Sequence, residues 1–330
     1  MKRLIFIFWL FIGLTSFVLV ADFPAAEIKN ESIKAKLYLP DAQRGYYQGT
    51  RFDWSGVIPS LEFQGHQYFG QWFEKYDPKV HESVMGPTEE FMVVGYDEAK
   101  PGDTFLKIGV GSLRKLDAAQ YFFAKYYDIV DPGKRTVKTK SDRVEFTHEL
   151  KDAAGYSYIY RKVVRLVKGK PQLVLEHSLR NTGQKAIATS VYNHNFFTID
   201  NEPTGPGIEV KFPFNVQPAG STRGFGDMVL ADDSKITYTR QLNKGEQVFS
   251  SSLEGFGTSA RDYDFRIENR KTGAGVRITS DQAIQKIVYW ACSTTSCPEP
   301  YIAINVAPGQ EVKWQINYDF YTFPKTAATR

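Results

Sequence analysis

Two residues in the second half of the chain carry side chains suited to acid/base chemistry, namely His194 and Glu299. His194 lies within the aromatic stretch 192–196, and Glu299 lies between Pro298 and Pro300. An imidazole and a carboxylate that face one substrate can move protons to and from its hydroxyl groups near neutral pH. The two residues would form such a pair if the folded sheet brings them to one concave surface. Each also has a structural interpretation, because a histidine on an aromatic strand fits a core and a glutamate between prolines fits a turn.

The residues around His194 have the alternating pattern of β-strands. Residues 173–180 alternate apolar and polar side chains, a turn signal follows at 181–183, and residues 187–200 resume the alternation. This pattern predicts a hairpin of two strands, with His194 on the second. His177 alternates with leucines on the first strand, so we expect it to be a buried histidine with a hydrogen-bond partner.

The stretch that follows Trp290 positions Glu299 and then gives the clearest strand of the chain, 311–320. One face of that strand is apolar and the other is polar, which is typical of a strand with one side on a core. The apolar face consists of Val312, Trp314, Ile316, Tyr318 and Phe320.

The rest of the chain is also dominated by strand signals separated by Gly and Pro turns. Residues 57–73 predict a hairpin that turns at 64–65, and the charged segment 74–90, broken by prolines, predicts a loop. Residues 121–130 mix helix and strand signals, and their aromatic pairs favour a strand. Because few helices and no fixed-period repeat are found, we expect one all-β domain, residues 22–330, built as a large antiparallel β-sandwich.

The composition argues against some classes of partner. The formal net charge is +4, and removing Lys2 and Arg3 with an N-terminal leader lowers it by two to +2. We therefore expect neither nucleic-acid binding nor attraction to an anionic membrane. Aromatic residues make up 15% of the chain; most are expected in the core, although such rings also form platforms for sugars. A monomer and a dimer are both compatible with this composition.

The N-terminus has the pattern of an export signal. A basic start, residues 1–3, precedes a largely apolar stretch, residues 4–20, which ends at the small residue Ala21. This pattern predicts a signal peptide, residues 1–21, that is cleaved on export to a periplasm or to the outside of the cell. The alternative is an uncleaved anchor, because about 17 apolar residues are just enough to span a bilayer.

The chain has two cysteines, Cys292 and Cys297. Export permits a disulfide, and their closeness predicts a small local bridge that would brace the loop presenting Glu299. The alternative is two small buried residues. A zinc site is not expected, because no histidines cluster with the pair.

Five segments combine these features in a recognisable order. Residues 179–183 end a strand with an Asn and a turn, and residues 192–197 carry a His before aromatic residues. Residues 297–301 carry a Glu, residues 306–310 form a Pro-Gly turn before the last strand, and residues 60–66 form an early hairpin. Together they resemble the aldose 1-epimerase (galactose mutarotase-like) family over most of the mature chain.

The resemblance implies a β-supersandwich with a concave sugar-binding face and no metal or organic cofactor. It implies that Glu299 is the base that takes the proton of the anomeric hydroxyl, while His194 is the acid that protonates the ring oxygen. The ring opens, the aldehyde end rotates, and closure from the other face gives the other anomer. The expected partner is therefore a carbohydrate, either a monosaccharide or the reducing end of an oligosaccharide.

The family also binds its sugar with an earlier His, an Arg and an acid. The implied counterparts are His81, which follows the first hairpin, and Arg51, which precedes it where the family's Arg follows it. The candidates for the acid are Asp200 and Asp227. The displaced Arg supports an alternative, a non-catalytic carbohydrate-binding protein on the same fold. A polysaccharide lyase or hydrolase is disfavoured, because the sequence points to no second positioned carboxylate for glycoside hydrolysis.

Overall fold

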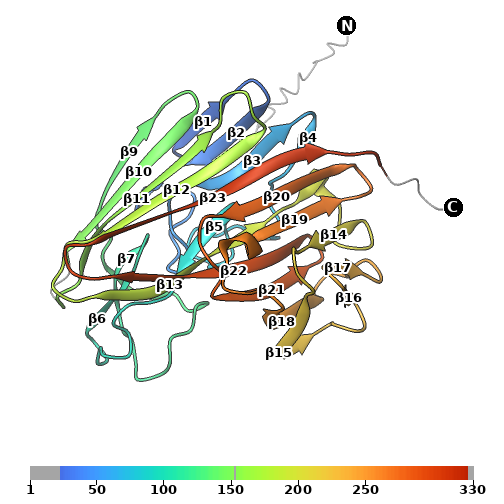
Figure 1. Ribbon diagram of the computed structural model, residues 1–330. Helices are drawn as coiled ribbons and strands as arrows, with labels where there is room; N and C mark the ends of the chain where they lie inside the picture. The colour runs from blue at the N-terminus through green and yellow to red at the C-terminus, as the bar shows by residue number, and fades with distance from the viewer. Residues whose placement is uncertain (1–22, 152–153, 326–330) are drawn as a thin grey trace, which may run out of the picture.

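The computed structural model describes residues 23–151 and 154–325, which fold almost wholly into antiparallel β-strands (Figure 1). These residues form four sheets, of which the two largest have ten and six strands. The predicted all-β class and large antiparallel architecture are confirmed. No helix of the described residues is long and apolar enough to cross a membrane. The predicted signal peptide, residues 1–21, lies outside the described residues.

The ten-stranded sheet forms one layer of the sandwich. In spatial order its strands are β16 (Val229–Asp232), β17 (Lys235–Tyr238), β14 (Ile208–Lys211), β19 (Asp264–Asn269), β20 (Ala274–Ser280), β23 (Glu311–Thr322), β12 (Gln172–Asn181), β11 (Ser157–Leu166), β10 (Arg143–Lys151) and β9 (Lys134–Thr139). β11 pairs with β12 over residues 158–166 and 173–181.

The six-stranded sheet carries the residues proposed for chemistry. Its order is β15 (Gln217–Arg223), β18 (Gln247–Glu254), β21 (Lys286–Cys292), β22 (Thr295–Val306), β13 (Ile187–Phe196) and β5 (Gly86–Phe91). In Figure 1 β13, β22, β21 and β18 lie side by side below the strands of the larger sheet.

Two smaller sheets and two short turns complete the described chain. One sheet consists of β1 (Ala25–Lys29), β2 (Ile33–Tyr38), β3 (Val57–Phe63) and β4 (His66–Gln67), and the other of β6 (Thr104–Lys107), β7 (Gly111–Arg114) and β8 (Ile129–Asp131). The 3₁₀ turns are η1 (Ile199–Asn201) and η2 (Ala260–Asp262). The predicted hairpin near residue 60 is confirmed as β3 and β4, although β4 is only two residues long.

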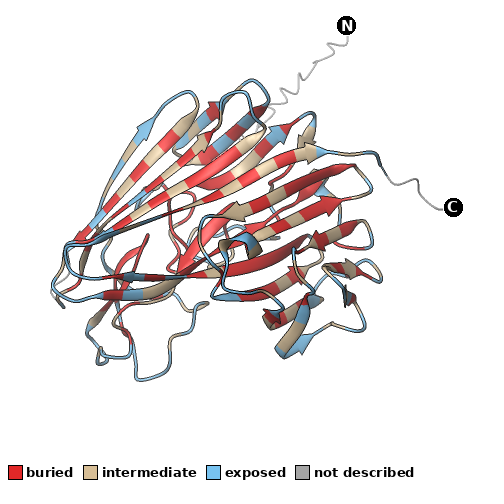
Figure 2. Ribbon diagram, viewed as in Figure 1, coloured by how far each residue is buried: buried red, intermediate tan, exposed pale blue. Residues whose placement is uncertain are grey.

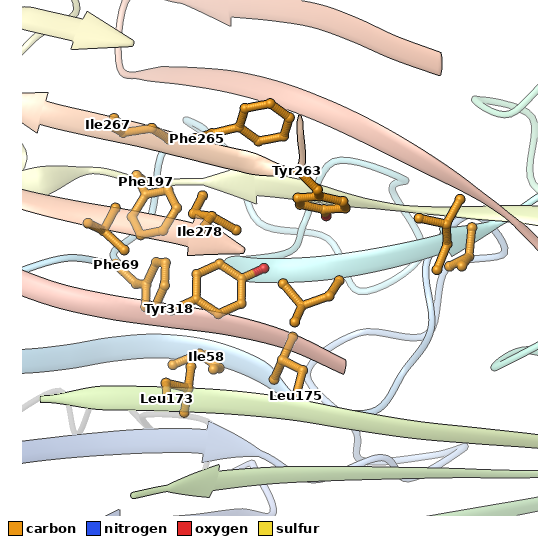
Figure 3. Packing of buried hydrophobic residues seen from close by; sticks show 14 of the residues in the cluster. Ile58, Phe69, Leu173, Leu175, Phe197, Tyr263, Phe265, Ile267, Ile278 and Tyr318 are labelled. Carbon is orange, nitrogen blue, oxygen red and sulfur yellow. The ribbon is translucent and has the colours of Figure 1, made fainter. Parts of the chain in front are cut away.

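The core lies between the two large sheets. Trp314, Ile316, Tyr318 and Phe320 of β23 are all at most 2% exposed, as the alternation predicted, whereas Val312 is half-buried. Figure 2 shows the same alternation of buried and more exposed residues along the strands of the ten-stranded sheet. Tyr318 packs among Leu173, Phe69 and Phe197 from other elements (Figure 3). Burial of this apolar surface is the main force that holds the layers together.

The predicted hairpin of residues 173–200 is wrong, although both of its strands exist. β12 pairs with β11 and β23, whereas β13 pairs with β22 and β5 in the other sheet. The connection crosses between the layers and is held by the Asn181 amide, which donates to the carbonyls of Lys185 and Val306, both at 2.8 Å. Alternation reports which face of a strand is buried and does not report the neighbouring strand.

The predicted loop at 74–90 is wrong over its last five residues, which belong to β5. All six residues of β5 are buried, including Glu89 and Glu90. The strand begins at Gly86, whose positive φ of 79° and close approach to Ile58 suit glycine. A strand this rich in charge is stable here because each carboxylate is paired with buried cations.

The predicted strand at 121–130 is also wrong, because only Ile129–Asp131 forms a strand (β8). Residues 121–128 are irregular, and they contribute Tyr121, Phe123 and Ala124 to the lining of a pocket. Tyr127 is buried in a core cluster, whereas Tyr121 and Phe123 line the cavity and Phe122 and Tyr126 are exposed.

Candidate active site

A cavity of about 410 Å³ opens beside the six-stranded sheet. Strands β5, β13, β22, β21 and β18 contribute its floor, and residues 81–82 and 121–124 contribute further lining. This volume falls in the range of sites for small molecules. The lining is strongly aromatic and includes Trp72, Tyr121, Phe123, Tyr192, Phe196, Phe249, Trp290 and Tyr301.

His194 and Glu299 meet at this cavity because their strands are neighbours. β13 and β22 pair with Tyr192 opposite Tyr301, so two residues further along each strand bring His194 opposite Glu299. Nε2 of the imidazole is 3.1 Å from Oε1 of the carboxyl group, and the two side chains are 4% and 5% exposed. The structure thus brings together the pair singled out in the sequence; its catalytic role stays a prediction.

Burial shifts the pKa values of the pair in opposite directions. It lowers the pKa of His194 well below 6.5, and the nearby Arg51 guanidinium lowers it further. It raises the pKa of Glu299 to about 8, against the opposing influence of Arg51 and with the support of the Glu90 carboxylate. Both shifts favour neutral groups, so near neutral pH the pair holds one proton, on the carboxyl group. The ring of Phe196 stacks on the imidazole with centroids 3.8 Å apart.

A charged cluster around Glu90 forms one wall of the cavity. Arg51 donates from Nε to Glu90 at 2.7 Å, Lys107 donates from Nζ at 2.8 Å, and Tyr192 donates its hydroxyl at 2.5 Å. Arg51 also donates to the Tyr192 oxygen at 2.9 Å. Burial alone would raise the pKa of Glu90, but the two cations outweigh it and lower that pKa. The carboxylate therefore stays ionised and fixes the guanidinium in the site.

His81 and Arg51, both predicted to bind substrate, line the cavity. His81 lies beside Phe123, with ring centroids 5.6 Å apart, and its Nε2 is 3.5 Å from a carboxylate oxygen of Glu82. Arg51 reaches the cavity from a segment that precedes the first hairpin and lies over the Phe123 ring at 4.2 Å. Their contact with a substrate stays a prediction.

The structure does not bring Asp200, which was predicted to bind substrate, to the cavity. Its side chain is bonded to Nδ1 of His66 at 2.8 Å and to the backbone N–H of Gln67 at 3.1 Å, and Asp200 is absent from the cavity lining. Asp200 lies in η1, beyond the end of β13, where the chain has already left the floor of the site. Its carboxylate holds the short strand β4 instead.

The predicted disulfide between Cys292 and Cys297 is wrong as well, because both cysteines are free thiols. In the hairpin of β21 and β22, Cys292 lies opposite Thr295 and Cys297 lies opposite Trp290. The cysteines are therefore diagonal neighbours, whose separation of about 7–8 Å exceeds the usual Cα distance of a disulfide. Burial raises the pKa of the Cys297 thiol, so it behaves as a small core residue.

A second ionic cluster lies on the opposite side of β5, inside the sandwich. Glu89 accepts hydrogen bonds from Lys162, from the Asn193 amide at 3.0 Å and from His177 at 3.0 Å. Burial alone would raise the pKa of Glu89, yet Lys162 and His177 outweigh it and lower that pKa to about 2. His177 is buried and stacks on Trp314, so its predicted place in the core is confirmed.

Several cavity residues were missed by the sequence analysis. Glu90 was assigned to a loop, and Trp72 was assigned to a hairpin. The available signal was the run Thr88-Glu89-Glu90, because two adjacent carboxylates on a strand must face opposite sides and both need partners. Among the described residues, no three His, Cys, Asp or Glu side chains gather in a way that could hold a metal ion.

No protein-family model matches the chain, and no curated protein sequence does. Solved structures do match. A galactose mutarotase-like protein from Clostridium acetobutylicum has a TM-score of 0.54 at 12% identity, over 91% of this chain and 95% of that one. A homologue of GalM/aldose epimerase from C. elegans has a TM-score of 0.54 at 13% identity, over 91% of this chain and 99% of that one.

A galactose mutarotase related enzyme from Lactobacillus acidophilus gives a TM-score of 0.53 at 13% identity, over 90% of this chain and 97% of that one. At such identities the likeness shows the fold alone. The fold is therefore the galactose mutarotase-like β-sandwich, and the resemblance stated from the sequence is confirmed at that level.

Proposed function

We propose that this protein is an exported aldose 1-epimerase-like enzyme that interconverts the anomers of a sugar. The observation that carries the proposal is the buried pair of His194 and Glu299, 3.1 Å apart at an aromatic cavity. The names of the structural neighbours, mutarotase-like and aldose epimerase-like, point to the same chemistry.

In the proposed reaction Glu299 accepts the proton of the anomeric hydroxyl while His194 donates a proton to the ring oxygen. The bond between the anomeric carbon and the ring oxygen breaks, and the anomeric carbon becomes an aldehyde. Rotation of the aldehyde and the reverse proton transfers close the ring from the other face. Protons, bonds and electrons balance without an outside reagent. Glu299 acts as the general base and His194 as the general acid of ring opening.

The opposite pKa shifts of the pair suit this cycle. Ring opening leaves Glu299 protonated and His194 neutral, which is the state that burial favours. Opening begins from the tautomer with the proton on the imidazole, and the contact between the two groups lets that proton pass directly. The single proton of the pair therefore rests on Glu299 near neutral pH and passes to His194 across their 3.1 Å contact when the ring opens.

The remaining lining suits a sugar. Trp72, Trp290 and Tyr301 offer apolar faces for the C–H side of a ring, while Arg51 and His81 offer hydrogen-bond donors for its hydroxyl groups. Arg51 is held by Glu90, so its guanidinium is in place before a sugar enters, which lowers the cost of binding.

A second candidate is a carbohydrate-binding protein without turnover. The engagement of Arg51 with both Glu90 and Tyr192 favours it, because those bonds occupy donors that a substrate would otherwise use. In that case the cavity would bind a sugar without changing the rate at which its anomers interconvert.

Export is part of the proposal and rests on residues 1–21 alone. The mass of the mature protein recovered from the producing cell tests it, because cleavage after Ala21 gives an N-terminus at Asp22. A protein that keeps all 330 residues and sediments with membranes would favour the uncleaved anchor.

The test of the function is the optical rotation of freshly dissolved sugars with and without the protein. We expect acceleration over the spontaneous rate for at least one sugar, and loss of that acceleration in His194→Gln. His66→Gln is the matched control, because His66 bonds Asp200 away from the cavity. Sugar binding without acceleration would support the second candidate.

A further inference from the structure

The exposed hydrophobic side chains of the described residues are not scattered. Seven of the eight large ones come from only two segments, 76–80 and 116–130. They are Tyr76, Val80, Leu116, Phe122, Phe123, Tyr126 and Val130. Single exposed apolar residues need no explanation, but a gathering of them on one surface marks a place where something binds.

The two segments are held together by the stretch that leads to Arg51. The backbone N–H of Gln48 donates to the carbonyl of Pro78 at 2.7 Å, and the Thr50 hydroxyl donates to the carbonyl of Lys125 at 3.4 Å. Across the two segments, Nζ of Lys79 lies 5.5 Å from the ring centre of Tyr126. The parts of the two segments around Lys79 and Tyr126 therefore lie on one surface.

This surface continues into the cavity through Phe123. Its ring lies over the Arg51 guanidinium at 4.2 Å and lines the cavity, although the residue is 41% exposed. Phe122, which is 56% exposed, has its ring centre 5.2 Å from that of Phe123 and lies outside the lining. We call Phe122, Phe123 and Tyr126 the aromatic rim.

The depth of the catalytic pair sets the direction in which a sugar must enter. The side chains of His194 and Glu299 are at most 5% exposed, so the anomeric carbon has to reach the bottom of the cavity. The opposite end of the same ring then points to the mouth. Any unit attached there leaves the cavity past Phe123, where the rim offers further rings on which a sugar can pack.

We infer that the aromatic rim is a saccharide-binding subsite, so that the substrate is the reducing end of an oligosaccharide rather than a free monosaccharide. This inference rests on the function proposed above. The rim supplies aromatic faces for the rings of a saccharide chain, and the cations beside them, Lys79 at Tyr126 and Arg51 at Phe123, can donate hydrogen bonds to its hydroxyl groups. Phe123 joins the two parts of the site, because it contacts both the cavity and Phe122.

The test compares glucose, maltose and maltotriose, and galactose with lactose, as reducing sugars of increasing length. Anomer exchange is followed by NMR, and sugar binding is measured by calorimetry on the same samples. The variants are Phe122→Ala and the double variant Phe122→Ala/Tyr126→Ala. Leu230→Ala is the matched control, because Leu230 is 47% exposed and lies outside the cavity lining.

For the wild type, we expect a higher kcat/KM for the longest sugar of a series than for its monosaccharide. The ratio of the two should fall about three- to tenfold in the rim variants, the range expected for losing one aromatic contact. The Leu230→Ala ratio should stay at the wild-type value. A wild-type ratio near one, or an equal fall for every sugar length, overturns the inference and leaves the proposed function standing.

If no sugar is turned over, the proposed function fails. The calorimetric affinities for sugars of increasing length then test whether the rim binds saccharides. Affinity that rises with sugar length and loses that rise in Phe122→Ala would support the rim as a subsite of a binding protein. Affinity independent of length, or no binding, would overturn it. A dimer of the wild type that dissociates in Phe122→Ala, measured by sedimentation, would assign the rim to a second copy of the chain and also overturn the inference.

Discussion

Nε2 of His194 lies 3.1 Å from Oε1 of Glu299, across two neighbouring antiparallel strands and with both side chains buried. Strand pairing fixes this separation, so the contact does not depend on a loop. Burial holds one proton on the pair near neutral pH, as the opposite shifts of the two pKa values require. An acid and a base that share one proton can open and close a sugar ring.

The rate of anomer interconversion should have a bell-shaped dependence on pH. As the pH falls, His194 takes up a second proton for the pair, at a pKa below the ordinary histidine value, and no base is left. As the pH rises through about 8, Glu299 loses the shared proton and no acid is left. The measurement is kcat/KM against pH after subtraction of the spontaneous rate. A rate that is still at its maximum well above pH 8 would contradict the assignment.

Glu299→Gln should stabilise the fold, and more so at high pH. The folded-state pKa of Glu299, about 8, exceeds its ordinary value of 4.5. Between these two pH values the unfolded chain loses the proton more readily than the folded one, so the wild type loses stability as the pH rises from 4.5 to about 8. The variant lacks this loss, which is on the order of 3–5 kcal/mol at most. Urea unfolding at pH 5 and pH 9 measures the difference. Glu98→Gln, on the exposed surface, is the control and should show no such trend.

Arg51→Met should move the whole pH profile to higher pH. The guanidinium lowers the pKa of both His194 and Glu299, so its removal raises both. Arg51→Lys keeps a positive charge and should restore most of the original profile, at the cost of its two-point contact with Glu90 and Tyr192. A purely structural role for Arg51 would lower the rate at every pH without shifting the profile.

Lys162→Met should destabilise the protein by about 3–5 kcal/mol, because it leaves Glu89 buried with too little positive charge. Chemical denaturation gives the free energy of unfolding. Lys168→Met, in an exposed turn between β11 and β12, is the matched control and should cost little. Equal stability of the two variants would show that His177 and Asn193 satisfy Glu89 without the lysine.

The strands and their buried faces could be predicted because period-2 alternation reports burial directly, as it does for residues 311–320. The sheet neighbours could not be predicted, because β12 and β13 each satisfy the same pattern whether or not they pair. β5 was not predicted, because a charged sequence is typical of a loop. The cations that let Glu89 and Glu90 be buried are distant in sequence. Asp200 was expected at the site and lies away from it, because its position after a strand does not report which way the chain turns.

Period-2 alternation also explains why only part of the site was predicted. His194 and Glu299 lie on strands whose pattern is plain, whereas Glu90 and Lys107 meet only through the tertiary fold. The aromatic segment 121–128 offered no alternation to interpret, because its side chains are divided among a cavity, the surface and a core cluster that holds Tyr127.

The most direct test of the catalytic role of His194 and Glu299 is the rate of anomer exchange, measured by NMR at equilibrium, for wild type, Glu299→Gln and Glu98→Gln. We expect acceleration of a reducing sugar by the wild type and by Glu98→Gln. In Glu299→Gln that acceleration should fall by about 10²–10⁴, the usual contribution of a general base. Acceleration that survives in Glu299→Gln would show that this pair does not carry the chemistry.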